Sequence, residues 1–359
     1  MVLSARSRRL PVTVVTGFLG AGKTSLLRHL LLSSGQRLAV LVNEFGELGI
    51  DGDLLRSCGF CPEEELEGRL VELANGCLCC TVQEEFIPTM EQLLARADQL
   101  DGILVETSGL ALPEPLIAAF GWPAIRHRTR VQGIVAVVDG EALAAGAVVA
   151  DPVAVERQRR LDATLEHASG IDELFEEQLE LADLVVVSRA DRIDTDGLDR
   201  VKLRIAAATR PGTPVVAVER GVIDPDLALG LSASGMERAP SDPAHQAEDD
   251  HHPDHDHVHV AMESMAFEAE GAFARPQLEQ LLQELIREGG LVRVKGRLWQ
   301  EGKTLPLQIQ AVGPRLECWY EGQPGTAHPP ALELVLLGFQ LNRSDIEQRL
   351  LALDAPESS

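Results

Sequence analysis

A glycine-rich segment at 17–24, GFLGAGKT, has the residue types and spacing of a phosphate-binding loop. Its glycines let backbone N–H groups turn toward phosphate oxygens, and the helical pattern that follows adds the positive end of a helix dipole. Lys23 is placed to hold β- and γ-phosphates, and the Thr24 hydroxyl to ligate Mg²⁺. The alternative is a turn without function, and the strand expected before the loop argues against it. The nucleotide-binding candidates here are Gly17, Gly20, Ala21, Gly22, Lys23, Thr24 and Ser25.

A second metal contact is expected where the apolar run GILVE ends in Glu106. A carboxylate at a strand end is placed to hold Mg²⁺ through water, and the alternative is a merely solvated acid. Gly109 follows three residues later, and without a Cβ its N–H can approach a γ-phosphate closely. Glu44 lies in a loop suited to positioning water. The catalytic candidates are Lys23, Thr24, Glu106 and Glu44.

The residues expected to bind the nucleotide base are SRAD at 188–191, where guanine-binding P-loop proteins carry Asn-Lys-x-Asp. Asp191 can accept from both guanine N1–H and the 2-amino group, a donor pair that adenine lacks. Arg189 can stack its planar guanidinium on a purine. Ser188 is too short to make every contact of an asparagine. The sequence predicts GTP and leaves its affinity open.

Three cysteines, Cys77, Cys79 and Cys80, stand within the five residues of GCLCC. The first two can converge from alternate positions of an extended segment, with Cys80 as the next candidate ligand. The segment precedes the helical pattern TVQEEFIPTMEQLLARA, and a helix N-terminus lowers a thiol pKa, so the metal-binding thiolate becomes accessible. Thiolates favour Zn²⁺, Co²⁺ or Cu⁺ over Mg²⁺. Buried packing is the alternative, which the clustering disfavours.

Two further cysteines, Cys58 and Cys61, leave a second metal interpretation open. Together with GCLCC they are spaced like a four-cysteine structural zinc ribbon, in which the metal would not be cargo. Cys318 lies in an expected strand and is interpreted as a packing residue. A weak metal-collecting role is expected for five histidines in HHPDHDHVH, with a solvated linker as the alternative: His251, His252, His255, His257 and His259.

The elements that must position these groups alternate along the chain. Short apolar strands separated by helical patterns indicate an α/β fold with a mostly parallel sheet; they are expected at 12–16, 38–43, 102–106, 133–139, 184–188 and 214–218. Beyond 260, one helix at 275–289 and several strands indicate a small α+β domain. SDIE at 344–347 resembles a capping box for a closing helix. The expected domains are 1–240, a His/Asp-rich linker at 241–259, and 260–359.

Composition narrows the partners. The chain has 359 residues and a formal net charge of −24, which argues against nucleic acid and against anionic membrane surfaces. No apolar run reaches membrane-spanning length, and the N-terminus lacks the apolar region of a signal peptide. Six cysteines in a chain of this length favour metal binding in a reducing compartment over a disulfide framework. A cytoplasmic location is therefore expected.

Taken together, GFLGAGKTSLL, NEFGELGIDGDLL, ELANGCLCCTV, ETSGLALPEP and SRAD resemble the CobW family of metal-handling P-loop GTPases. FIPTMEQLL and PLIAAFGWPAIR resemble the members associated with aerobic cobalamin synthesis. The resemblance implies a slow GTPase metallochaperone that uses GTP and Mg²⁺ and delivers Co²⁺, or alternatively Zn²⁺, to a client such as cobaltochelatase. A monomer or a nucleotide-dependent homodimer is expected. Ser188 and Arg189 depart from the family pattern and weaken the base assignment.

A P-loop kinase with a structural zinc site is the competing function. Kinase chemistry needs an acceptor pocket and usually an arginine-bearing lid, and the sequence shows no clear candidate for either. SRAD after a sheet strand also favours a guanine site.

Overall fold

The computed structural model describes residues 9–42, 70–72, 86–110, 112–161, 170–230, 262–322 and 328–354. The chain divides into two compact units, Met1–Leu229 and Gly230–Ser359, and each is described by itself.

The described part of the first unit contains a seven-stranded sheet in the order β3-β2-β4-β1-β5-β6-β7, and every strand pair is parallel. The strands are β1 Leu10–Thr16, β2 Leu38–Val42, β3 Leu70–Glu72, β4 Gly102–Glu106, β5 Thr129–Asp139, β6 Leu184–Ser188 and β7 Val215–Ala217. β1 and β4 are apolar almost throughout because both faces of a parallel sheet are covered. Since the strands are parallel, their carboxyl ends lie at one edge of the sheet.

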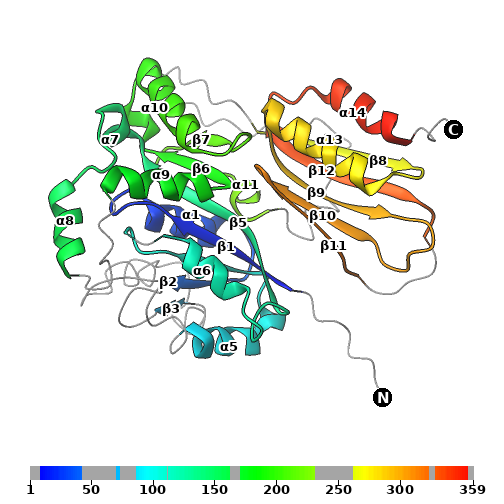
Figure 1. The fold of residues 1–359 in the computed structure, drawn as a ribbon, viewed down its shortest axis with the longest axis horizontal. Coiled ribbons are helices and arrows are strands. Elements are labelled where there is room, and N and C mark those ends of the chain that lie inside the picture. Colours follow the sequence, from blue (N-terminus) through cyan, green and yellow to red (C-terminus); the bar gives the residue numbers. More distant parts are fainter. Residues whose placement is uncertain are drawn as a thin grey trace. The chain divides into compact units, whose positions relative to one another are not determined.

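Helices lie on both faces of this sheet (Figure 1). They are α1 Lys23–Ser33, α5 Ile87–Ala95, α6 Glu114–Phe120, α7 Gly140–Ala144, α8 Pro152–Leu161, α9 Ile171–Leu181, α10 Thr195–Ala208 and α11 Pro225–Leu229, with the short 3₁₀ turns η2 Ala97–Gln99 and η3 Ala190–Arg192. One buried cluster joins α5 and α6 to β1, β2 and β4. A second joins α9 and α10 to β5 and β6. The predicted α/β class with a mostly parallel sheet is confirmed.

One expected helix of the first unit is described only in part. Helix α5 is described from Ile87, with a proline in its first turn, and residues 81–85, where the sequence pattern placed the start of this helix, lie outside the described residues. Pro88 is suited to that first turn because it has no N–H to leave unbonded there. Among the described residues, no helix is long and apolar enough to cross a membrane.

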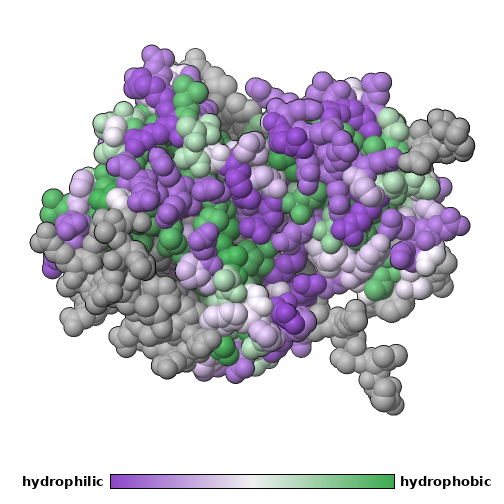
Figure 2. Space-filling view, in the orientation of Figure 1, coloured by the Kyte–Doolittle hydropathy of each residue, from purple (hydrophilic) through white to green (hydrophobic). Residues whose placement is uncertain are grey.

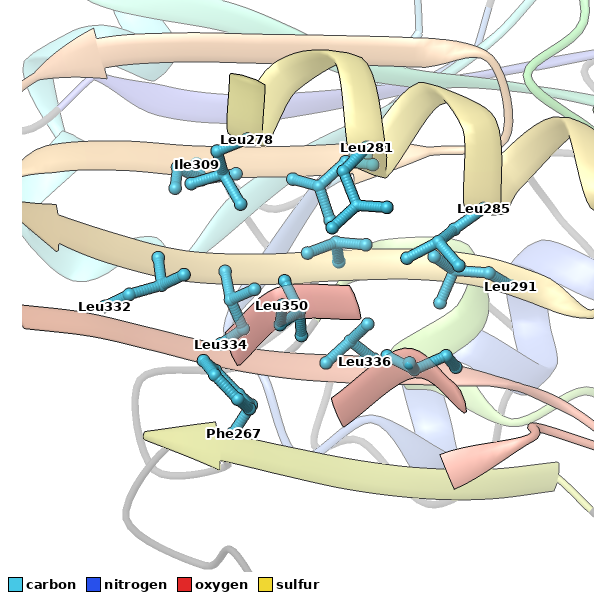
Figure 3. Close-up of a cluster of buried hydrophobic side chains, with 14 of the residues drawn as sticks. Phe267, Leu278, Leu281, Leu285, Leu291, Ile309, Leu332, Leu334, Leu336 and Leu350 are labelled. Carbon is cyan, nitrogen blue, oxygen red and sulfur yellow. The ribbon is translucent and has the colours of Figure 1, made fainter. Parts of the chain in front are cut away.

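The second unit is a five-stranded antiparallel sheet with helices packed on it, in the strand order β11-β10-β9-β12-β8. Its elements are β8 Met262–Glu270, α13 Arg275–Glu288, β9 Leu291–Trp299, β10 Leu307–Val312, β11 Arg315–Tyr320, β12 Ala331–Phe339, α14 Arg343–Leu351 and η4 Ala352–Asp354. Leu278, Leu281 and Leu285 of α13 point toward the sheet, where Leu334 and Leu336 meet them (Figure 3). The visible surface over α13 is mostly hydrophilic (Figure 2). The expected small α+β domain is confirmed.

The cap of the closing helix differs from the prediction. Asn342, not Ser344, is the N-cap of α14, and its side chain accepts from the Asp345 N–H at 3.3 Å. Asn is as good a cap as Ser, and it stands one residue before helical geometry begins at Arg343. Cys318 packs against the core of this unit, as expected for a packing residue.

Candidate functional site

The phosphate-binding loop joins β1 to α1 and is fixed by close backbone packing. Gly17 has φ 134°, and a Cβ there would lie 2.1 Å from the Val137 carbonyl oxygen of β5. Gly22 is the N-cap of α1 at φ 103°, a left-handed conformation that favours glycine. The loop closes on itself through the Ala21 N–H, which donates to the Phe18 carbonyl at 3.1 Å. The sequence therefore builds a strand–loop–helix cradle at the carboxyl edge of the sheet.

The loop lysine lies beside the carboxylate that ends β4. β1 and β4 are neighbours, with Val15 level with Glu106. Lys23 Nζ lies 3.8 Å from Glu106 Oε1 and donates to the Phe18 carbonyl at 3.2 Å, and both charged side chains are buried. A buried ion pair at a strand end is oriented by its partners and is costly to break. The structure thus brings together two residues 83 positions apart that were predicted to share the phosphate site.

These residues fit an Mg²⁺–phosphate group. Thr24 supplies a hydroxyl on the first turn of α1, and Glu106 supplies a buried carboxylate next to Lys23. Hydroxyl and carboxylate oxygens are hard ligands, which Mg²⁺ prefers. Bound Mg²⁺ would neutralise charge on the phosphates there.

The segment after β4 lies against the phosphate-binding loop. The Thr107 N–H donates to the Val15 carbonyl at 2.9 Å, and its hydroxyl donates to the Thr16 hydroxyl at 3.0 Å. A Cβ on Gly109 would lie 2.6 Å from the Leu19 nitrogen, so this close approach requires glycine. Gly109 therefore adjoins the cradle, as its sequence position predicted.

The predicted base-binding residues follow β6, which lies next to β5. Ser188 is buried; its hydroxyl donates to the Val138 carbonyl at 3.1 Å, and its Cβ lies 3.4 Å from the position a Cβ would take on Gly22. Arg189 has φ 54°, and Asp191 lies exposed in η3. SRAD therefore adjoins the phosphate-binding loop, with its aspartate at the solvent edge.

Arg189 makes contacts that sequence reasoning did not anticipate. Its guanidinium donates to the buried carboxylate of Asp139 and, at 3.0 Å, to the Gly20 carbonyl. Asp139 ends β5 and also caps α7, because it accepts from the Ala142 N–H at 3.2 Å. An acid at the end of the apolar run GIVAVVD was the available sequence signal for this residue.

Two further parts of the site were missed. The Ala190 N–H of the base loop donates to the Val218 carbonyl at 3.2 Å, and a Cβ on Gly221 would lie 3.2 Å from the Leu26 nitrogen of α1, so 218–221 borders the cradle. Gln178 of α9 is buried and donates from Nε2 to the Gly109 carbonyl at 3.4 Å. Amphipathic spacing in the sequence predicts that α9 packs on the sheet. It does not indicate that the buried Gln178 would contact the phosphate site.

Several predicted residues lie outside the part of the chain that the structure describes. They are Glu44, Cys58, Cys61, Cys77, Cys79, Cys80, His251, His252, His255, His257 and His259. Their roles stay predictions.

The parallel sheet, the β1–α1 loop and the Lys23–Glu106 pair define a P-loop nucleotide-binding protein. The family model "CobW/HypB/UreG, nucleotide-binding domain" matches residues 11–217, and "Cobalamin synthesis protein cobW C-terminal domain" matches residues 262–353. The chain therefore belongs to the CobW family of P-loop GTPase metallochaperones.

Relatives of this chain are similar along most of their length. The zinc chaperone CobW of Pseudomonas aeruginosa is 44% identical over 349 residues, which cover 95% of this chain and 91% of that protein. The zinc chaperone CobW of a Sinorhizobium species is 41% identical over 338 residues, covering 93% and 94%. The crystal structure of Zn(II)-bound YjiA GTPase from E. coli is 22% identical, covers 97% of this chain and all of that one, and has a TM-score of 0.38.

Proposed function

We propose that this protein is a zinc chaperone that binds Zn²⁺ at Cys77, Cys79 and Cys80 and releases it to a client enzyme when GTP is hydrolysed. In this proposal Lys23 and the loop N–H groups hold the phosphates and Thr24 and Glu106 hold Mg²⁺. Asp191 selects guanine, and Glu44 positions the attacking water. The family membership favours this GTPase function over the P-loop kinase alternative.

One observation supports coupling between the cysteines and the nucleotide. In the sheet, Val42 of β2 is level with both Glu72 of β3 and Glu106 of β4. Strands in a sheet are about 4.8 Å apart, so the backbone at Glu72 is roughly 10 Å from the backbone at the carboxylate of the phosphate site. Cys77 follows Glu72 by five residues. Strand β3 therefore ends, five residues before Cys77, at the edge of the sheet where the nucleotide is expected.

Strand β2 ends at the same level of the sheet. Val42 is its last strand residue, and NEFGELG begins at the next position. A segment ordered by a γ-phosphate is released on hydrolysis, which is a common switch in P-loop proteins. Both the expected switch and the metal motif would thus respond to the same phosphate. This arrangement would give GTP and GDP different effects on metal affinity.

Zinc is proposed in place of cobalt as the principal cargo. The two CobW relatives that cover nearly the whole chain are both zinc chaperones by name. At a thiolate site the intrinsic affinity order also places Zn²⁺ above Co²⁺. A cobaltochelatase client, and with it a role in cobalamin synthesis, stays a prediction from family resemblance.

The proposal is tested by titrating the full chain with Co²⁺ as a spectroscopic probe, in GTPγS·Mg²⁺ and in GDP·Mg²⁺. Thiolate-bound tetrahedral Co²⁺ absorbs intensely, and Zn²⁺ should abolish the signal by displacement. We expect affinity at least tenfold higher with GTPγS, because hydrolysis-driven release needs a difference between the two states, about 1.4 kcal/mol per tenfold. Equal affinity in both states would make the metal structural and remove the chaperone mechanism.

Cysteine variants identify the ligands. Cys77→Ser and Cys79→Ser should each remove the charge-transfer band, whereas Cys318→Ser is the matched control because it packs in the second unit. A loss of binding in Cys58→Ser or Cys61→Ser would support the zinc-ribbon alternative. Retention of the band in all four variants, at Cys58, Cys61, Cys77 and Cys79, would place the metal elsewhere.

A further inference from the structure

Helix α9 contacts both segments that are expected to surround the terminal phosphate. Phe175 stacks on Phe18 of the phosphate-binding loop, with ring centroids 6.3 Å apart and planes 27° apart. One turn later on the same helix, Gln178 donates from Nε2 to the Gly109 carbonyl at 3.4 Å. Gln178 is only 2% exposed, so its amide is committed to the interior. A buried amide without partners is costly, which makes this side chain sensitive to where its acceptor lies.

Gly109 is held between α9 and the phosphate-binding loop. On one side its Cα faces the loop so closely that a Cβ would lie 2.6 Å from the Leu19 nitrogen. On the other side its carbonyl accepts from Gln178. The two sides together restrict movement of the Gly109 backbone toward or away from the loop.

The residues around Gly109 have anchors of a different kind. Thr107 is tied to β1 by its N–H bond to the Val15 carbonyl at 2.9 Å. Ser108 contacts its own segment, because its hydroxyl accepts from the Leu110 N–H at 3.4 Å. Neither contact reaches a neighbouring helix. Gln178 therefore links this segment to a helix that also packs on the phosphate-binding loop.

We propose that Gln178 is a positioning residue for the γ-phosphate: it holds the Gly109 carbonyl so that the Gly109 N–H stays within reach of a terminal phosphate oxygen. This inference rests on the proposed placement of the γ-phosphate at Gly109. Glutamine suits the task because a neutral amide donates to a carbonyl, whereas a carboxylate would repel both that carbonyl and a phosphate. The effect is confined to the triphosphate state, because GDP has no group at that position.

The experiment compares GTPγS and GDP affinity, by calorimetry on the full chain with Mg²⁺, for wild type and for Gln178→Met. Methionine is similar in length to glutamine and fills the same buried space, but it cannot donate a hydrogen bond to the Gly109 carbonyl. We expect GTPγS affinity to fall about tenfold, the scale of one lost hydrogen bond in the bound state, with GDP affinity changed less than twofold. The ratio of the two affinities is the decisive readout, since a general loss of structure lowers both. Steady-state turnover should fall as well.

Two further variants complete the design. Glu176→Gln lies on the exposed side of α9 and should leave the affinity ratio at its wild-type value. Gln178→Asn keeps the amide but is one methylene shorter, and it provides a second measurement if the methionine variant does not fold. An unchanged ratio in a folded Gln178 variant would overturn the inference.

Gly109→Ala separates this inference from the function on which it rests. If Gly109→Ala lowers the GTPγS-to-GDP ratio and folded Gln178→Met does not, only the role of Gln178 fails. If Gly109→Ala also leaves the ratio unchanged, the γ-phosphate does not lie at Gly109, and the proposed site fails with it.

Discussion

The guanidinium of Arg189 lies 3.0 Å from the Gly20 carbonyl oxygen, and this contact joins the base loop to the phosphate-binding loop. The same side chain is paired with the buried carboxylate of Asp139, which caps α7. Arg189 is thus a brace between three segments, in addition to any contact with a purine. A planar guanidinium can donate in two directions at once, which a lysine ammonium does less rigidly.

Replacing Arg189 with alanine should therefore weaken GDP and GTP binding to a similar degree. The change removes a hydrogen bond to the phosphate-binding loop and leaves Asp139 buried without its cation. We expect each nucleotide to lose about 2–4 kcal/mol of binding free energy. Arg189→Lys should retain part of the affinity. Calorimetry with both nucleotides measures this. Full retention of affinity in the alanine variant would contradict the bracing role.

Guanine selection is expected to depend on Asp191. Asp191→Ala should weaken GTP binding by about 2–4 kcal/mol, because two charge-assisted hydrogen bonds to the base are lost, and should leave ATP binding unchanged. Competition between GTP and ATP in wild type and variant gives the measurement. Equal affinities in the wild type would overturn the guanine assignment.

The Cys318 thiol is predicted to be unreactive. Burial, and then a hydrogen bond with Glu279, raise the pKa of Cys318 to about 12 from 9.0. Alkylation at pH 8, followed by peptide mass spectrometry, should label Cys318 more slowly than a solvent-exposed thiol, and Glu279→Gln should speed its labelling. The pKa of Cys318 is higher in the folded than in the unfolded protein. The contribution of this thiol to the free energy of unfolding is therefore complete below about pH 9 and is lost as pH rises toward 12. Rapid labelling of the native protein would contradict this prediction.

An ion cluster between α13 and α14 should stabilise the second unit. Arg349 lies 2.7 Å from Glu288 and 3.4 Å from Glu284. The hydrogen bond from Arg349 lowers the pKa of Glu288, so the contribution is present above the unfolded pKa near 4.5 and is lost as pH falls through the lower folded value. Arg349→Ala should cost about 0.5–1 kcal/mol at pH 7 and less at pH 3, measured by denaturant unfolding. If the loss of stability in Arg349→Ala is as large at pH 3 as at pH 7, Arg349 stabilises this unit through packing and not through its charge.

Deleting residues 245–259 should leave the basal GTPase rate nearly unchanged, because a polar linker contributes little burial. We expect slower metal loading when free Zn²⁺ is limiting, since the five histidines would no longer collect it. Stopped-flow loading with a competing chelator measures the effect. Equal loading rates would assign the histidines no role in metal capture.

Features that repeat along the chain, or that carry strong local sequence signals, could be predicted from the sequence. Continuous apolar runs predicted the parallel strands, because a strand covered on both faces has no polar alternation. Lys23 and Glu106 were each expected at the phosphate site, and the structure places them 3.8 Å apart, since a phosphate-binding loop and a strand-end acid share one edge of such a sheet.

Contacts that depend on tertiary geometry were beyond the sequence. The brace at Arg189 requires β5 and β6 to be neighbours, and the contact of Gln178 requires α9 to lie over Gly109. No local pattern encodes either neighbour. The cap at Asn342 was missed for another reason: two suitable capping residues stand close together, and the backbone conformation decides between them.

The strand order has a consequence for synthesis of the protein. β1 lies between β4 and β5, and β6 follows β5, so the central part of the sheet is complete only when the chain has reached Ser188. A nascent chain that ends before Asp191 lacks the residue expected to recognise the base, although its phosphate-binding loop was made long before. Parallel pairing of distant segments is slow to form. Guanine nucleotide should therefore bind only after about half of the chain has left the ribosome, and its binding would then stabilise the first unit while the second is still being translated.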